Sequence, residues 1–110
     1  MKAYHEVITK QTITITNLNA LKKSITLENL LTMTSGLECR DSYRYKWAGL
    51  TEMRKCGDWA QHFLDLPMDE PAGKRFEYCN GNSQLISTII QITTNMTPLD
   101  FAQKYLFDPL

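Results

Sequence analysis

Four segments of this 110-residue chain carry start or stop signals of α-helices, and no other feature limits the choice of fold as much. The first segment reads ITLENLLTMTSGL, and its leucines recur at helical spacing. Thr26 is placed to cap the helix, and Ile25 and Leu30 occupy the two positions of a hydrophobic staple. Gly36 suits the left-handed residue that follows the end of a helix. We therefore expect a helix that begins at Thr26 and is ended by Gly36.

The second and third helices are predicted from a cap and from an apolar stripe. Asp58, followed three residues later by Gln61, predicts a helix start, and this helix must end before Pro67. Farther along, apolar residues recur at i, i+1, i+4 and i+5, which indicates a helix despite their β-branched content. These residues are Leu85, Ile86, Ile89 and Ile90. Asn95 tolerates the left-handed conformation that would end this third helix.

The fourth helix is predicted by TPLD, with Thr97 as the cap, Pro98 in the first turn and Asp100 at the third position. Its apolar face would consist of Phe101, Tyr105 and Leu106.

Two stretches differ from these helices. Residues 38–57 are polar and aromatic without a clean period and are expected to be irregular, and TITIT near the N-terminus alternates as a strand would, without a partner strand. The chain is therefore predicted to be mainly α-helical.

Composition argues against several classes of function. The chain has twelve basic and twelve acidic residues and no long run of like charge, which argues against binding to nucleic acid or a membrane surface. No stretch approaches the roughly 18 to 20 apolar residues of a membrane span. The first residues lack the apolar run of a signal peptide, so a cytoplasmic location is the default expectation.

The cysteines do not suggest a disulfide or a metal site. Cys39, Cys56 and Cys79 form an odd number without C-x-x-C spacing, which favours neither a disulfide framework nor a zinc site. We therefore expect reduced thiols, no metal and no cofactor.

Three sequence blocks point to one family. They are ITLENLLTMTSGL, PAGKRFEYCN and NSQLISTIIQITTNMTPLDFAQKYLFDPL. In order and spacing they resemble the serine β-lactamase and penicillin-binding-protein-like hydrolases, especially the class C β-lactamase and esterase branch. The resemblance implies that residues 25–110 form the helical portion of the β-lactamase-like α/β serine hydrolase fold and lack most of its sheet. Residues 1–24 are an unmatched N-terminal segment.

The resemblance also assigns a role to FEYCN. In the family, a serine in an S-x-x-K motif attacks the acyl group, and the lysine and the tyrosine of a Y-x-N motif assist its deprotonation. By position, Tyr78 resembles that catalytic tyrosine, and Asn80 resembles the asparagine that holds the substrate amide. A free phenol with a pKa of about 10 is a poor base at neutral pH, so neighbouring cations from elsewhere would have to assist it. The alternative for Tyr78 is a half-buried aromatic side chain that closes a loop over the core.

Two other side chains invite interpretation as nucleophiles. Cys79 lies in the middle of the triplet, but a reactive thiol needs a base, and His62 belongs to a separate helical segment. Packing behind the tyrosine and asparagine is therefore the better interpretation of Cys79. Ser35, in TSG, is better explained by a capping or turn role.

The motifs that would complete an active site are missing from this sequence. No serine is followed by lysine at the third position, and neither K-T-G nor H-x-G follows Tyr78. A site needs its nucleophile, base and oxyanion donors together, so we expect an inactive fragment of a serine hydrolase whose complete form acts on a small-molecule acyl substrate. The alternatives are a non-catalytic helical interaction module and a truncated gene product. Without the sheet, apolar faces such as that of Leu85, Ile86, Ile89 and Ile90 should be uncovered, so the chain alone is expected to be marginally folded or to self-associate.

Overall fold

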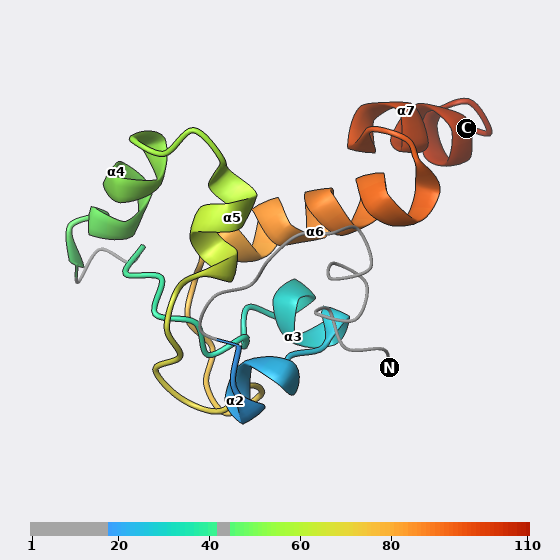
Figure 1. Ribbon diagram of the computed structural model, residues 1–110. Helices are drawn as coiled ribbons and strands as arrows, with labels where there is room; N and C mark the ends of the chain where they lie inside the picture. The colour runs from blue at the N-terminus through green and yellow to red at the C-terminus, as the bar shows by residue number, and fades with distance from the viewer. Residues whose placement is uncertain (1–17, 42–44) are drawn as a thin grey trace.

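The computed structural model describes residues 18–41 and 45–110. Its helices are α2 (Ala20–Lys23), α3 (Leu27–Leu31), α4 (Ala48–Arg54), α5 (Trp59–Leu64), α6 (Asn80–Thr94), α7 (Pro98–Ala102) and the π-helical turn η2 (Gln103–Phe107). Helix α6 crosses the molecule, with α5 against it and α7 at its far end (Figure 1). No strand occurs within the described ranges, where Leu37 and Met68 form an isolated antiparallel bridge. The prediction of a mainly helical fragment is confirmed for these ranges, and TITIT lies outside them.

At three of the predicted helix starts, the predicted capping side chain makes its hydrogen bond to the first turn of the helix. Thr26 Oγ1 accepts the Asn29 N–H at 3.2 Å, and Asn29 Oδ1 accepts the Thr26 N–H at 2.9 Å, which completes a capping box at α3. Asp58 caps α5 and Thr97 caps α7, each through the N–H three residues ahead. These starts are confirmed, and each depends on groups only three residues apart.

One predicted helix end is confirmed and one is wrong. Asn95 ends α6 in the left-handed conformation, with φ of 54°. Helix α3, however, ends at Leu31, and the left-handed residue that follows it is Met33 rather than Gly36. Gly36 is also left-handed, with φ of 80°, and the chain there passes the backbone carbonyl of Glu70 so closely that a Cβ would not fit.

The segment 38–57, expected to be irregular, contains the seven-residue helix α4. The residue before this helix, Trp47, is left-handed, with φ of 59°, and makes no side-chain hydrogen bond to the first turn. A helix that starts in this way lacks the polar cap by which helix starts are recognised in sequence. Gly49 and Met53 are the buried residues of α4, so tertiary packing rather than a local sequence signal accounts for this helix.

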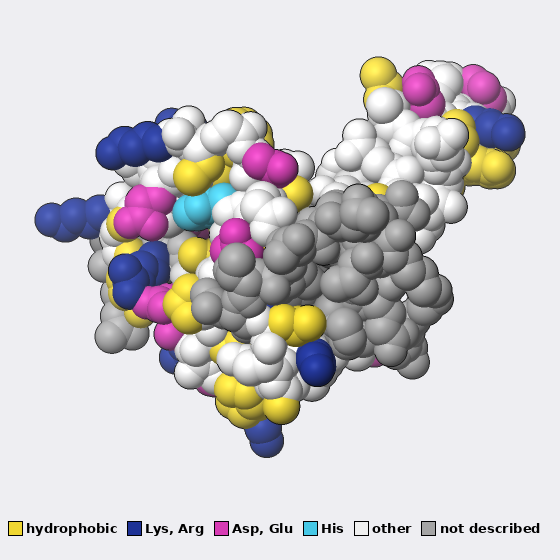
Figure 2. Space-filling view, in the orientation of Figure 1, with side chains coloured by type: hydrophobic (Ala, Val, Ile, Leu, Met, Phe, Trp, Pro, Cys, Tyr) yellow, Lys and Arg dark blue, Asp and Glu magenta, His cyan; other side chains and the backbone are white. Residues whose placement is uncertain are grey.

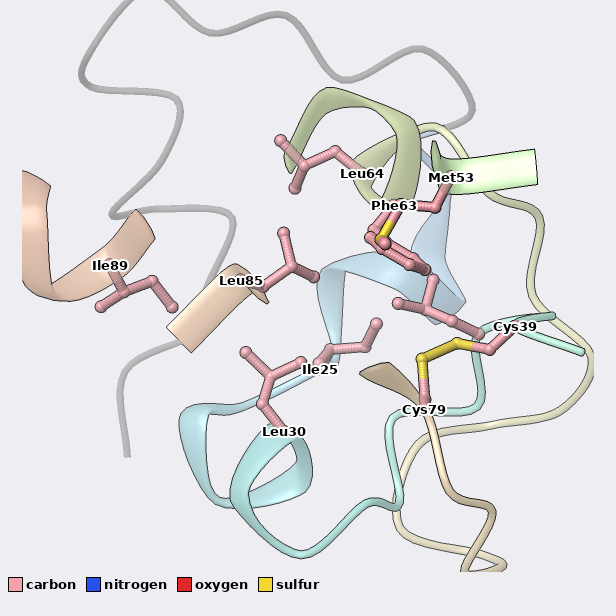
Figure 3. Packing of buried hydrophobic residues seen from close by; sticks show 10 residues of the cluster. Ile25, Leu30, Cys39, Met53, Phe63, Leu64, Cys79, Leu85 and Ile89 are labelled. Atoms are coloured by element: carbon pink, nitrogen blue, oxygen red, sulfur yellow. A yellow bond between two sulfur atoms is a disulfide. The ribbon is translucent and has the colours of Figure 1, made fainter. Parts of the chain in front are cut away.

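The core lies between α3, α5 and α6 (Figure 3). It consists of Ile25, Leu30, Leu37, Cys39, Met53, Phe63, Leu64, Cys79, Leu85 and Ile89. Leu85 is 0 % exposed and Ile89 is 7 % exposed, because α3 and α5 pack on this face of α6. The expectation that the apolar stripe of α6 lies uncovered is therefore wrong for these two residues.

A group of exposed apolar side chains lies at the C-terminal end of the described chain. Neither α7 nor η2 contains a buried residue. Leu99 is 71 % exposed, and Tyr105, Leu106 and Phe107 are each more than half exposed. Hydrophobic side chains are visible on the lobe that these two elements form (Figure 2). Within the described ranges, no helix has both the length and the apolar character needed to cross a membrane.

Candidate active site

A disulfide between Cys39 and Cys79 corrects the expectation of reduced thiols (Figure 3). The Cα atoms of the two residues are 5.7 Å apart, although 40 positions separate them in the sequence. Counting cysteines could not reveal this pair, because the tertiary fold brings the two segments together. Cys79 is therefore not a free nucleophile. The free cysteine is Cys56, whose sulfur lies 3.4 Å from His62 Nδ1.

Tyr78 and Asn80, the two predicted site residues, contact each other directly. The Tyr78 hydroxyl donates a hydrogen bond to Asn80 Oδ1 at 3.0 Å. The tyrosine side chain is 46 % exposed, which fits both a site residue and an aromatic ring at the edge of the core. The bond couples the phenol to the carboxamide of the same triplet, so one side chain cannot turn without affecting the other.

Asn80 is the first residue of α6, and a carboxylate distant in sequence caps this helix. The first N–H groups of a helix have no acceptor within it, and Cys79, at the N-cap position, makes no side-chain hydrogen bond. Asp41 Oδ2 instead accepts the Asn80 backbone N–H at 2.8 Å and Asn80 Nδ2 at 3.3 Å. Negative charge at a helix N-terminus is stabilised by the helix dipole. Asp41 therefore fixes both the backbone and the side chain of Asn80.

Asp41 is fully buried, and sequence reasoning missed it. Burial raises the pKa of its carboxyl above the ordinary value of 3.8, while the hydrogen bonds from Asn80 and the nearby His62 oppose this rise. Within the described residues, its second oxygen, Oδ1, has no hydrogen-bond partner. Gly49 of α4 lies so close to the carboxyl that a Cβ at position 49 would collide with it. An aspartate between two helices carries no local sign of such burial.

A second set of buried polar contacts joins Asn82, in the first turn of α6, to the segment after α3. Ser35 Oγ donates to Asn82 Oδ1 at 2.9 Å, and Asn82 Nδ2 donates to Met33 Sδ at 3.5 Å. Both Ser35 and Asn82 are buried. Ser35 Oγ also accepts the Leu37 N–H at 3.5 Å, which is the local turn role expected for it. Its hydroxyl is thus engaged in the interior and does not face a substrate.

An open depression of about 290 Å³ lies beside Asn80. Its other lining residues are Leu50, Met53, Trp59, Ser83 and Gln84. The lining combines apolar side chains with amide and hydroxyl groups, as small-molecule sites commonly do. Among residues 18–41 and 45–110, no group of three or more His, Cys, Asp or Glu side chains is arranged to hold a metal ion.

A comparison with protein families matches this chain over most of its length. The family model described as Beta-lactamase matches residues 16–110. This match includes the three sequence blocks and also the end of the segment 1–24, which the blocks leave out. No curated protein matches the chain.

Proposed function

Because the chain belongs to the β-lactamase family, we propose that it supplies the Y-x-N part of an acyl-transfer site. In this proposal, Tyr78 assists proton transfer and Asn80 holds the amide or carbonyl of a small acyl substrate, such as a β-lactam, peptide, ester or amide. The observation that carries the proposal is the 3.0 Å hydrogen bond between these side chains at the start of α6. It holds the phenol against the carboxamide of Asn80, and Asn80 lines the open depression.

The hydrogen bonds leave both side chains with groups for this chemistry. The Tyr78 hydroxyl donates its hydrogen bond to Asn80, so the lone pairs of its oxygen are available to accept a hydrogen bond from an attacking hydroxyl. Asn80 Nδ2 carries two protons, and one of them is directed to Asp41. The second can be donated to a substrate carbonyl. The pair can therefore position a substrate carbonyl and an attacking hydroxyl without breaking the contact with Asp41.

The nucleophile must come from residues outside these 110. None of the serines in the sequence begins an S-x-x-K motif, and Ser35 is buried with its hydroxyl bonded to Asn82. A positioned tyrosine without a nucleophile has nothing to activate. We infer that the 110-residue chain alone does not turn over substrate.

Two assays on the purified chain test this inference. Hydrolysis of a chromogenic cephalosporin and of a nitrophenyl ester should not exceed the rate in buffer. A fluorescent penicillin or a fluorophosphonate should leave no covalent adduct on any serine. Saturable turnover that survives in Tyr78→Phe, or a stoichiometric adduct on Ser35 or Ser83 by mass spectrometry, would overturn the proposal.

The exposed apolar lobe favours a second candidate, a helical module that associates with another copy of this chain. Leu99 and Leu106 are 71 % and 53 % exposed, and no residue of α7 or η2 is buried. Apolar surface of this kind is commonly covered by a partner. Sedimentation velocity should then show a concentration-dependent oligomer that Leu99→Asp and Leu106→Asp abolish. A monomer at every concentration would remove this candidate.

A further inference from the structure

Asp41 is a buried carboxylate, and its burial needs a physical reason. It is 0 % exposed, and within the described residues neither lysine nor arginine forms a salt bridge with it. Burying a charge without a counter-ion is unfavourable. A helix cap alone does not require this arrangement, since serine, threonine or asparagine at the N-cap position would serve. In this chain Cys79, which is held in the disulfide, takes the N-cap position, and Asp41 accepts the first helical N–H in its place.

The contact with Asp41 determines which way the Asn80 carboxamide points. An ionised carboxylate only accepts hydrogen bonds, so the group of Asn80 that faces it must be the NH₂. Because the carboxamide is planar, Asn80 Oδ1 then faces away from Asp41. There it accepts the Tyr78 hydroxyl at 3.0 Å. The direction of the phenolic O–H is thus set by a residue that does not touch it.

We propose that Asp41 is a positioning residue, which acts through Asn80 to orient the hydroxyl of Tyr78. We call this chain of contacts, from Asp41 through Asn80 to Tyr78, the relay. Its role in catalysis rests on the function proposed above, whereas the contacts themselves do not. Asp41 holds Asn80 by two hydrogen bonds, at 2.8 and 3.3 Å, and Asn80 holds Tyr78 by one.

The covalent structure keeps the two ends of this relay together. Cys39 lies two residues before Asp41, and Cys79 lies between Tyr78 and Asn80, so the disulfide joins the segments that carry all three side chains. Gly49 closes the space behind the Asp41 carboxyl. The carboxylate therefore has little freedom to turn away from α6.

NMR of the Asn80 side-chain amide in the 110-residue chain tests the relay. In Asp41→Ala the two amide proton signals should move to their positions in the denatured chain and exchange with solvent roughly tenfold faster or more, because a charge-assisted hydrogen bond is lost. Asp41→Asn keeps an acceptor at the same place and should restore most of the wild-type signals. Asp58→Ala is the matched control: it also removes a helix cap, that of α5, and should leave the Asn80 signals unchanged.

The wild-type protein gives a second readout that needs no destabilising variant. On acidification, the Asn80 amide signals should titrate with a midpoint above 3.8, and Asp41→Asn should abolish this titration. Among the described residues, His62 is the charged group that favours the ionised form of Asp41, and the titration should persist in His62→Gln.

Two results would overturn the relay: Asn80 signals that ignore pH, or equal changes in Asp41→Ala and Asp58→Ala. If Asp41→Ala does not fold, the wild-type titration and Asp41→Asn decide the question. Failure of the proposed function, such as activity in a complete enzyme that does not depend on Tyr78, would leave these spectra unaffected. The two ideas are therefore refuted by different experiments.

Discussion

Removal of the Cys39–Cys79 disulfide should destabilise the chain strongly. The two cysteines are 40 positions apart, and the entropy of closing a loop of this length corresponds to a stabilisation of about 4 kcal/mol. Domains of this kind are stable by only about 5 to 15 kcal/mol. Replacement of both cysteines by alanine should therefore lower the melting temperature by more than about 10 °C. The loss should be largest at the segments that carry Asp41 and Tyr78, because the disulfide joins them.

Thermal melting and urea unfolding followed by circular dichroism measure this effect, with and without reductant. Thiol titration of the unreduced protein should first find Cys56 as the one free thiol. Cys56→Ala is the matched control, and because this residue lies in no disulfide, its replacement should cost less than about 1 kcal/mol. Three free thiols in the unreduced protein, or equal stability of the double variant and the control, would refute the reasoning.

Packing and charge give three further predictions, each measured by urea unfolding. Gly81→Ala would push a Cβ into an aromatic ring of α5 and should lower the free energy of unfolding by about 1 to 3 kcal/mol. Gly57→Ala, with open space around it, should change the free energy of unfolding by less than about 0.5 kcal/mol. Equal losses in the two variants would contradict the packing of α5 on α6. Leu85→Ala leaves a cavity at a fully buried position and should lower the free energy of unfolding by about 2 to 5 kcal/mol. Leu99→Ala, at a position that is 71 % exposed, should leave the free energy of unfolding nearly unchanged. The reverse order would contradict the placement of the core. The native state binds the Asp41 proton more tightly than the unfolded state, so the free energy of unfolding should fall as the pH rises from 3.8 to the raised native pKa. Asp41→Asn should remove that slope, and an unchanged slope would show that another group causes it.

The features that sequence could predict are those set by neighbouring residues. The caps at Thr26, Asp58 and Thr97 each join a side chain to an N–H three positions away, so their chemistry can be recognised without a fold. Asn95 is likewise recognisable, because few side chains tolerate the left-handed end of a helix. The pairing of Tyr78 with Asn80 lies within one triplet, and the structure brings these two side chains together.

The features that sequence could not predict depend on segments distant along the chain. Lys22 is an example, since lysine is normally exposed, yet here it is fully buried and its Nζ donates to the Leu64 carbonyl at 2.8 Å. That carbonyl lies at the end of α5, where cations are favourable. Burial lowers the pKa of Lys22, and Asp65 opposes the change. Asp41 and the Cys39–Cys79 pair escaped prediction for the same reason: their partners are about 40 residues away.

The most direct test of the proposed site is the activity of Tyr78→Phe in a protein that contains these residues together with an S-x-x-K nucleophile. Loss of a general acid or base should lower kcat/KM by about 10² to 10⁴. The substitution removes one hydroxyl, bonded to Asn80 at a position that is 46 % exposed, so the free energy of unfolding should change by only about 1 kcal/mol. The predicted result is a folded protein with little activity. Unchanged turnover in a folded Tyr78→Phe protein would show that the Y-x-N triplet of this chain does not take part in the chemistry.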